Sequence, residues 1–234
     1  MVSVVLGIDA AWIPQNPSGI ALLTVAPGRK PELLRAARAC AEFTSAHEFG
    51  PRDWLSIPPS GETLNISGIL DATIRHAGAL PDVIALDIPL SPLAIRGRRP
   101  ADNAISSKYG SRWAGTHTPS AKRPGPVSAD LFRQLSRAGY YWINASEPVQ
   151  LNGQIRYFLE TYPHPVIIEM MGLKRRLCYK VAKRREYWPS LTPDGRWRKL
   201  ASELDRLRTA LALRIDGFAG CMPKACAILH SESL

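Results

Sequence analysis

The feature that most constrains this chain is a short apolar run that ends in an aspartate, and it occurs twice. Residues 4–8 lead into Asp9, and residues 83–86 lead into Asp87. Because aliphatic and β-branched residues follow one another without polar alternation, both runs predict buried strands. A carboxylate at the end of a buried strand is costly unless a partner offsets its charge. Two such carboxylates on neighbouring strands repel each other unless a cation separates them or one takes up a proton, so a divalent metal site is the first hypothesis.

Hydrophobic periodicity and turn residues predict the order of the elements. We expect strands over residues 3–9, 20–25, 83–88 and 157–162, and helices from 64 to about Gly78 and over 128–138, 165–172 and 198–214. Residues 31–43 have helical propensity, but a third antiparallel strand fits better after two hairpin-like turns. The segment 215–234 has no strong pattern.

This order predicts an α/β fold, in which a mixed sheet of three antiparallel strands followed by parallel strands is flanked by helices. The first and fourth strands are joined through a helix, so we expect parallel neighbours with Asp9 and Asp87 at one sheet edge. Residues 91–150 are rich in Gly, Pro, Ser and Arg and exceed the length of an ordinary connection. We interpret them as an insertion or lid beside the site, within a single domain over 1–234.

Positive charge is concentrated in the second half of the chain. The formal net charge is +10, and residues 91–200 hold 20 of the 30 Lys and Arg side chains but 7 of the 20 Asp and Glu side chains. Aromatic residues are interleaved with the basic clusters, as in proteins that bind a phosphate backbone and stack on bases. Nucleotides, anionic metabolites or an acidic protein also suit this charge, and a solvated Arg-rich surface is the structural alternative.

Other patterns exclude several classes of protein. The cysteines show neither CxxC nor Cys/His zinc spacing, which favours free thiols in a reducing compartment. No run reaches the roughly 18 apolar residues of a membrane span, and the N-terminus lacks a signal-peptide pattern, so we expect a cytoplasmic protein without a membrane partner. No GxGxxG or GxxxxGK[ST] phosphate loop occurs.

Five short motifs, taken in order, match a known family. They are residues 7–12 (Gly-Ile-Asp-Ala-Ala-Trp) with 18–19 (Ser-Gly), 85–90 (Ala-Leu-Asp-Ile-Pro-Leu), 99–102 (Arg-Pro-Ala-Asp), 159–164 (Leu-Glu-Thr-Tyr-Pro-His) and 179–180 (Tyr-Lys). With them the chain resembles the ribonuclease H-like fold and, more specifically, domain-of-unknown-function family 429, whose members are described as predicted nucleases. The resemblance implies that strand-end acids, here Asp9 and Asp87, bind catalytic metals. It also implies another acid, supplied by the last helix. Asp216 and Glu232 are the candidates for this acid, and both match the family pattern poorly.

The leading hypothesis is therefore a metal-dependent nuclease that hydrolyses phosphodiester bonds. Asp9, Asp87 and Glu160 would bind two Mg²⁺ or Mn²⁺ ions about 3.5–4 Å apart, while the basic insertion holds a DNA or RNA backbone. Hard oxygen ligands suit these ions. Each acid also has a structural interpretation, because Asp9 can cap a turn, Asp87 can belong to a structural turn, and Glu160 can pair with an arginine such as Arg99.

A second set of residues is predicted to bind substrate: Arg96, Arg99, Asp102, His117, His164 and Lys180. The alternatives are a salt bridge for Asp102, a surface position for His117, a helix-capping role for His164 and a solvated side chain for Lys180. Trp12, beside the first aspartate, fits core packing better than a stacking platform.

Two rival functions use the same fold. Sugar kinases and actin-like ATPases also begin with a strand-end Asp, but their first turn is glycine-rich, whereas residues 10–14 here are bulkier. The other rival is a catalytically inactive module that binds nucleic acid, whose binding would be salt-sensitive but independent of metal.

Overall fold

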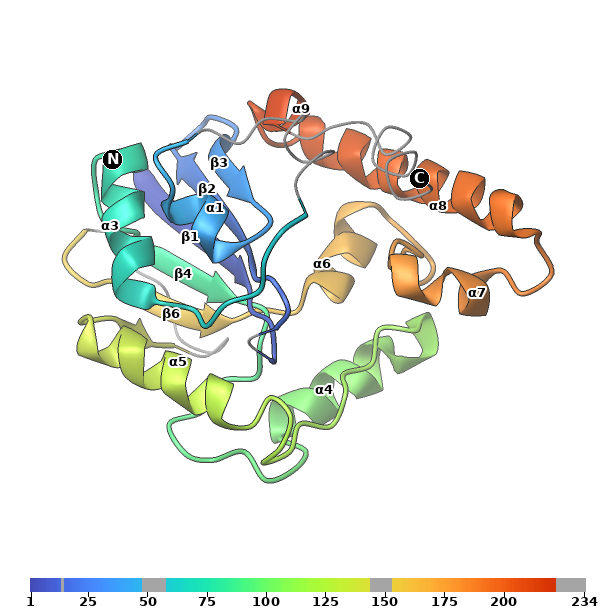
Figure 1. Ribbon diagram of the computed structural model, residues 1–234, viewed down its shortest axis with the longest axis horizontal. Coiled ribbons are helices and arrows are strands. Elements are labelled where there is room, and N and C mark those ends of the chain that lie inside the picture. Colours follow the sequence, from blue (N-terminus) through green and yellow to red (C-terminus); the bar gives the residue numbers. More distant parts are fainter. Residues whose placement is uncertain (14, 48–57, 144–152, 222–234) are drawn as a thin grey trace.

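The computed structural model describes residues 1–13, 15–47, 58–143 and 153–221, and one six-stranded sheet organises them (Figure 1). In spatial order the strands are β3 (Glu32–Ala37), β2 (Gly19–Val25), β1 (Ser3–Asp9), β4 (Val83–Leu86), β6 (Tyr157–Glu160) and β5 (Tyr141–Trp142). β1, β2 and β3 pair antiparallel, whereas β4, β6 and β5 continue the sheet parallel to β1. The expected mixed α/β sheet is therefore confirmed, including a strand within the ambiguous segment 31–43.

The helices lie around this sheet. They are α1 (Cys40–Thr44), α3 (Ile66–Ala77), α4 (Pro100–Tyr109), α5 (Pro126–Arg137), α6 (Pro163–Met170), α7 (Arg184–Tyr187), α8 (Pro193–Ala212) and α9 (Phe218–Cys221), with 3-10 turns η1 (Gly110–Arg112) and η2 (Val181–Lys183). α3 begins after the capping side chain of Asn65, which accepts a hydrogen bond from the Gly68 amide at 3.3 Å. It ends where Gly78 adopts φ 73°, the left-handed conformation that favours glycine.

One face of the sheet carries the main hydrophobic core. Leu6, Leu22, Ile84 and Phe158 contribute to it from four strands, and all are fully buried. α1, α3 and α5 supply the opposing side chains, such as Phe43, Ile69 and Leu131. The positions between these on β1 and β4 are only half-buried, so burial alternates along the strands. The predicted burial of these strands is thus complete on the core face and partial on the second face.

The insertion is more regular than the sequence predicted. The hydrophobic pattern does not predict α4, although Pro100 at its first position and Asp102 in its first turn are typical helix-start signals. Further along, α5 packs Leu131 and Leu135 into the core, and β5 extends the sheet by pairing with β6. Within the predicted insertion, residues 126–142 therefore pack with the main sheet and its core.

The carboxyl ends of β1, β4 and β6 lie at one edge of the sheet. In Figure 1 the arrowheads of β1 and β4 point toward the half of the molecule that holds α4, α6 and α7. Asp216, one candidate for a further site acid, lies at the opposite edge, because its backbone pairs with Glu32 at the start of β3. It is therefore excluded from a site at Asp9, and Glu232 lies outside the described residues. No helix in the described part of the chain is long and apolar enough to cross a membrane.

Candidate functional site

Asp9 and Asp87 lie side by side at the carboxyl edge of the sheet. β1 and β4 are parallel neighbours with Ile8 opposite Leu86, so both strands reach their aspartate at the same level. The Asp87 amide donates to the Ile8 carbonyl oxygen at 2.9 Å, which continues the ladder to this point. Adjacent strands are about 4.8 Å apart, so the two acids are near neighbours. The predicted convergence is confirmed for this pair.

Local contacts hold the turn that carries Asp9. The buried Ser18 hydroxyl accepts a hydrogen bond from the Ala11 amide at 3.0 Å, which ties the turn to the start of β2. Gly19 pairs directly with Asp9, and a Cβ at Gly19 would stand 3.8 Å from the Asp9 Cβ. The turn therefore presents Asp9 at the rim of the sheet rather than into the core.

Burial makes both carboxylates costly to ionise, and repulsion from Asp9 adds to this cost for Asp87. Asp9 has a solvent-exposed side, but desolvation by the surrounding protein still raises its pKa, and Lys180 opposes this rise. For Asp87, desolvation followed by repulsion from Asp9 raises the pKa to about 7, with Lys180 again opposing and Glu160 adding to the rise. A carboxylate pair in this state favours a proton or a cation as its neighbour.

The ionisation of Asp87 gives a measurable pH dependence. Its pKa rises from 3.8 to about 7 in the fold, so the stability that its protonated form contributes is present below pH 4 and lost as the pH passes 7. In EDTA at pH 8, Asp87→Asn should therefore raise Tm by about 2–4 °C, as expected for a gain of about 1 kcal/mol in a chain of this size. Thermal melts at pH 4 should show no such difference. An equal difference at both pH values would contradict the assignment.

Glu160 reaches the same edge but is engaged by Arg99. Its two carboxylate oxygens accept from both Nη atoms of Arg99 at 2.6 Å, and Oε2 also accepts from the Leu90 amide at 3.0 Å. Arg99 in turn donates to both oxygens of the buried Asp102. The structural alternatives for Glu160 and Asp102 are therefore the ones found, and this three-residue network is called the Arg99 fork below.

The Arg99 fork shifts the pKa of two of its members, Arg99 and Asp102. Burial opposes the charge on Arg99, but hydrogen bonds to Glu160 and Asp102 raise the pKa of its guanidinium overall. Burial also works against ionised Asp102, yet the hydrogen bonds from Arg99 outweigh it and lower the pKa of this acid. The fork is thus a network of hydrogen-bonded ion pairs, which fixes the start of α4 against the end of β6.

A cavity of about 90 Å³ opens beside these acids. Among the predicted site residues, it is lined by Asp87, Asp102, Glu160 and His117, and Trp12 forms part of its wall. Trp12 also packs against the core, so its expected packing role is confirmed together with a place at the cavity. Arg96 is exposed and does not line the cavity.

The histidines differ in their access to the cavity. His117 lines it, and burial followed by the charges of Lys180, Lys183 and Arg176 lowers its pKa. His164 lies in the first turn of α6 and is 4 % exposed, which leaves almost no surface for a substrate. Burial, then the charge of Lys180, lowers the pKa of His164 to about 3, so its imidazole is neutral at physiological pH.

Two tyrosines without a role in the sequence analysis also belong to this region. Tyr179 contacts the His164 Nδ1 atom at 3.5 Å, and burial followed by the charges of Asp87 and Asp9 raises its pKa. Tyr162 lines the cavity and donates to the Gly115 carbonyl oxygen at 3.2 Å. Both phenols are therefore protonated donors near the acids. Their position inside the family motifs is the sequence signal that could have identified them.

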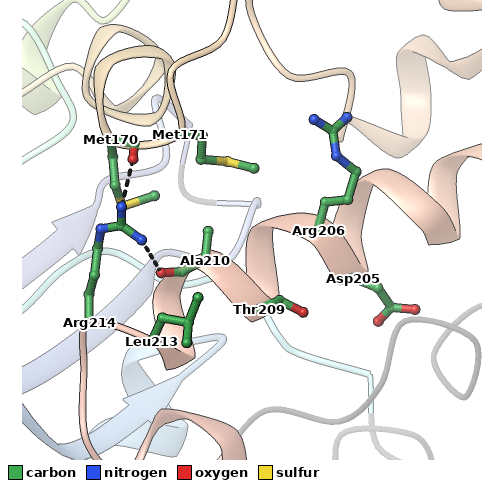
Figure 2. A pocket seen from close by; sticks show the side chains of 8 residues that line it. All are labelled: Met170, Met171, Asp205, Arg206, Thr209, Ala210, Leu213 and Arg214. Carbon is green, nitrogen blue, oxygen red and sulfur yellow. Dashed lines mark hydrogen bonds between the residues drawn. The ribbon is translucent and has the colours of Figure 1, made fainter.

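A second cavity, of about 430 Å³, lies between α6 and α8 (Figure 2). Its arginines are engaged within the protein, since Arg214 donates to the carbonyl oxygens of Met170 and Ala210, both at 2.9 Å. Arg206 pairs with Glu203 at 2.7 Å. This cavity shares no lining residue with the first one, so the acids at the sheet edge remain the candidate site.

The residues present fit one hard cation better than two. In the described ranges, no three His, Cys, Asp or Glu side chains gather into a ready-made metal site. Asp9 and Asp87 offer carboxylate oxygens, whereas the oxygens of Glu160 are taken by Arg99. Mg²⁺ is usually bound through one or two carboxylates together with water and substrate phosphates, which this pair can provide.

Comparisons with models of known protein families, with curated proteins and with solved structures find no match for this chain. The resemblance to domain-of-unknown-function family 429 therefore stays a prediction that rests on the motif residues.

Proposed function

We propose that the protein is a divalent-metal-dependent nuclease whose site is the Asp9–Asp87 pair. The observation that carries the proposal is the pairing of two desolvated strand-end carboxylates, each with a raised pKa, at the carboxyl edge of a mixed sheet. This edge is where α/β folds commonly bind ligands. Asp9 and Asp87 would hold one Mg²⁺ or Mn²⁺ ion, which supplies Lewis-acid polarisation of a phosphoryl oxygen and activation of water.

The charges around the pair suit an anionic substrate. Lys180 acts electrostatically on both aspartates, and Arg176, Lys183 and Arg123 act on His117 at the cavity wall. These cations raise the local concentration of a polyanion and orient its phosphate toward the acids. The protonated phenol of Tyr179 can donate a hydrogen bond to a phosphate oxygen or leaving oxygen.

The Arg99 fork would act as a support for this site. It fixes Glu160 and the start of α4, and with them the cavity wall that carries Asp102. Glu160 then contributes negative charge next to Asp87 rather than a direct ligand. This arrangement replaces the expected three-acid, two-ion cluster with a two-acid, one-ion site.

The test is cleavage of labelled nucleic acid by the purified full-length chain. We expect single-stranded or duplex DNA or RNA to be cut with Mn²⁺ or Mg²⁺, and the reaction to stop in EDTA and return when excess metal is added. Calorimetry should show binding of one Mn²⁺ per chain. Absence of both Mn²⁺ binding and cleavage across all these substrates would contradict the proposal.

The inactive nucleic-acid-binding module is the second candidate. It is favoured by one observation, namely that Arg99 holds both oxygens of Glu160 and leaves two acids at the edge. In that case nucleic acid should bind with equal affinity in Mn²⁺ and in EDTA, weaken steeply with salt, and stay uncut.

A further inference from the structure

Trp113 combines an exposed side chain with an unusual backbone conformation. It follows η1 and has φ 63°, and among the described residues it is the one non-glycine with a positive φ. Its side chain is 53 % exposed. The left-handed region costs an L-residue about 1–2 kcal/mol, so neighbouring contacts must stabilise this geometry. Such outliers are concentrated at ligand-binding sites, which makes Trp113 a candidate contact residue.

Contacts on both sides of Trp113 fix the ring outside the core. The Trp113 amide donates to the Gly110 carbonyl oxygen at 3.0 Å, and the next amide, of Ala114, donates to the Tyr109 carbonyl oxygen at 3.0 Å. Ala114 is fully buried against Ile168 of α6. The chain therefore turns inward directly after Trp113 and leaves the indole at the surface.

Arg175 stacks on the exposed indole. Its guanidinium carbon lies 4.3 Å from the Trp113 ring centroid. The segment that carries Arg175 is tied to η1, because the Arg176 amide donates to the Arg112 carbonyl oxygen at 2.8 Å and the Arg112 guanidinium donates to the Leu173 carbonyl oxygen at 2.7 Å. An aromatic face beside a fixed cation is the combination that binds a base and its phosphate.

Both halves of this stack lie only a few residues along the chain from groups that are near the acids. Trp113 precedes His117, which lines the cavity with Asp87, by four residues, and four residues span at most about 14 Å. Arg175 precedes Lys180, whose charge acts on Asp9 and Asp87, by five residues. A nucleic-acid strand with one base on this stack can therefore place the phosphate of a nearby nucleotide at the acids.

We propose that Trp113 and Arg175 form a stacking subsite that selects single-stranded nucleic acid for the site at Asp9 and Asp87. Its position relative to cleavage rests on the proposed nuclease function, whereas the stacking itself does not. Arg175 covers one face of the indole, so a base would stack on the part of the ring that stays exposed. A base in a single strand can offer its face there, while a base in a duplex is already stacked and paired. Arg175 supplies the backbone contact beside the stacked base.

The test is binding in EDTA, which separates affinity from cleavage. Fluorescence anisotropy at one fixed salt concentration would compare short labelled oligothymidylate and oligouridylate with a hairpin duplex. Trp113→Ala should weaken single-strand binding about 5–150-fold, the equivalent of losing one stacked base, and leave duplex binding nearly unchanged. Trp113→Phe keeps an aromatic face and should retain most of the affinity.

The control is Tyr141→Ala, which removes another exposed aromatic side chain (64 % exposed) on the edge strand β5. It should bind single strands like the wild-type protein. Equal affinity of wild type and Trp113→Ala for single strands, duplex binding as tight as single-strand binding, or no single-strand binding at all would each overturn the subsite. Binding that depends on Trp113 without any metal-dependent cleavage would instead remove the nuclease function and leave the subsite standing.

Discussion

Replacing Arg99 by methionine should lower the free energy of unfolding by about 3 kcal/mol, because removal of one partner leaves buried carboxylates uncompensated. The Arg99 side chain is 17 % exposed, and its partner Asp102 is 4 % exposed. Arg99 also donates to the Leu90 carbonyl oxygen at 3.2 Å. Methionine fills a similar volume but pairs with none of these groups.

Chemical unfolding and thermal melts at pH 7 would measure the loss, and two variants make it specific. Arg133→Met removes the partner of Asp130 in an exposed pair, with side chains 59 % and 44 % exposed. Such a pair contributes about 1 kcal/mol or less. Adding Asp102→Asn to Arg99→Met should recover part of the stability, because one unpaired charge disappears. Equal losses for the Arg99 and Arg133 variants would show that the Arg99 fork has no special stabilising role.

The sheet could be predicted from the sequence because its signals are local. The apolar runs that end at Asp9 and Asp87 stand out by composition, and Gly78 marks the end of α3 through its conformational freedom. The connection through a helix then required β1 and β4 to be parallel. These rules need no knowledge of distant side chains, so the position of the acid pair followed from them.

The side-chain partners at the site could not be predicted in the same way. Arg99 and Glu160 are 61 positions apart, and although Arg99 could be named as an example of a partner, no local signal in the sequence decides between this ion pair and metal binding by Glu160. The choice depends on where α4 places Arg99, and α4 itself was missed within a Gly- and Pro-rich segment. The backbone of Trp113 is similar, since its positive φ is imposed by contacts of Ala114 and Arg112 with other elements. Tertiary packing decides both features.

Asp9→Asn should reduce metal-dependent cleavage at least about 10³-fold, the equivalent of several kcal/mol of transition-state stabilisation. The amide keeps the size of the side chain but removes one of the two charges that would hold the ion. Loss of a residue that only hydrogen-bonds to a metal ligand typically costs 10–100-fold in metal affinity. Asp9 would be a ligand itself, so Mn²⁺ binding measured by calorimetry should weaken by about 100-fold or more.

The matched control uses the same change at the opposite end of the same strands. Asp82 lies before β4, where its Oδ2 accepts from the Val4 amide at 2.8 Å, and Asp82→Asn keeps an acceptor there. It should leave Mn²⁺ binding and cleavage near wild-type levels. Asp9→Asn should also be no less stable than wild type in EDTA, because repulsion from Asp9 raises the pKa of Asp87 and is relieved by the amide. A protein that keeps its Mn²⁺ affinity after Asp9→Asn holds the ion elsewhere, since a site built from two carboxylates cannot lose one of them without effect.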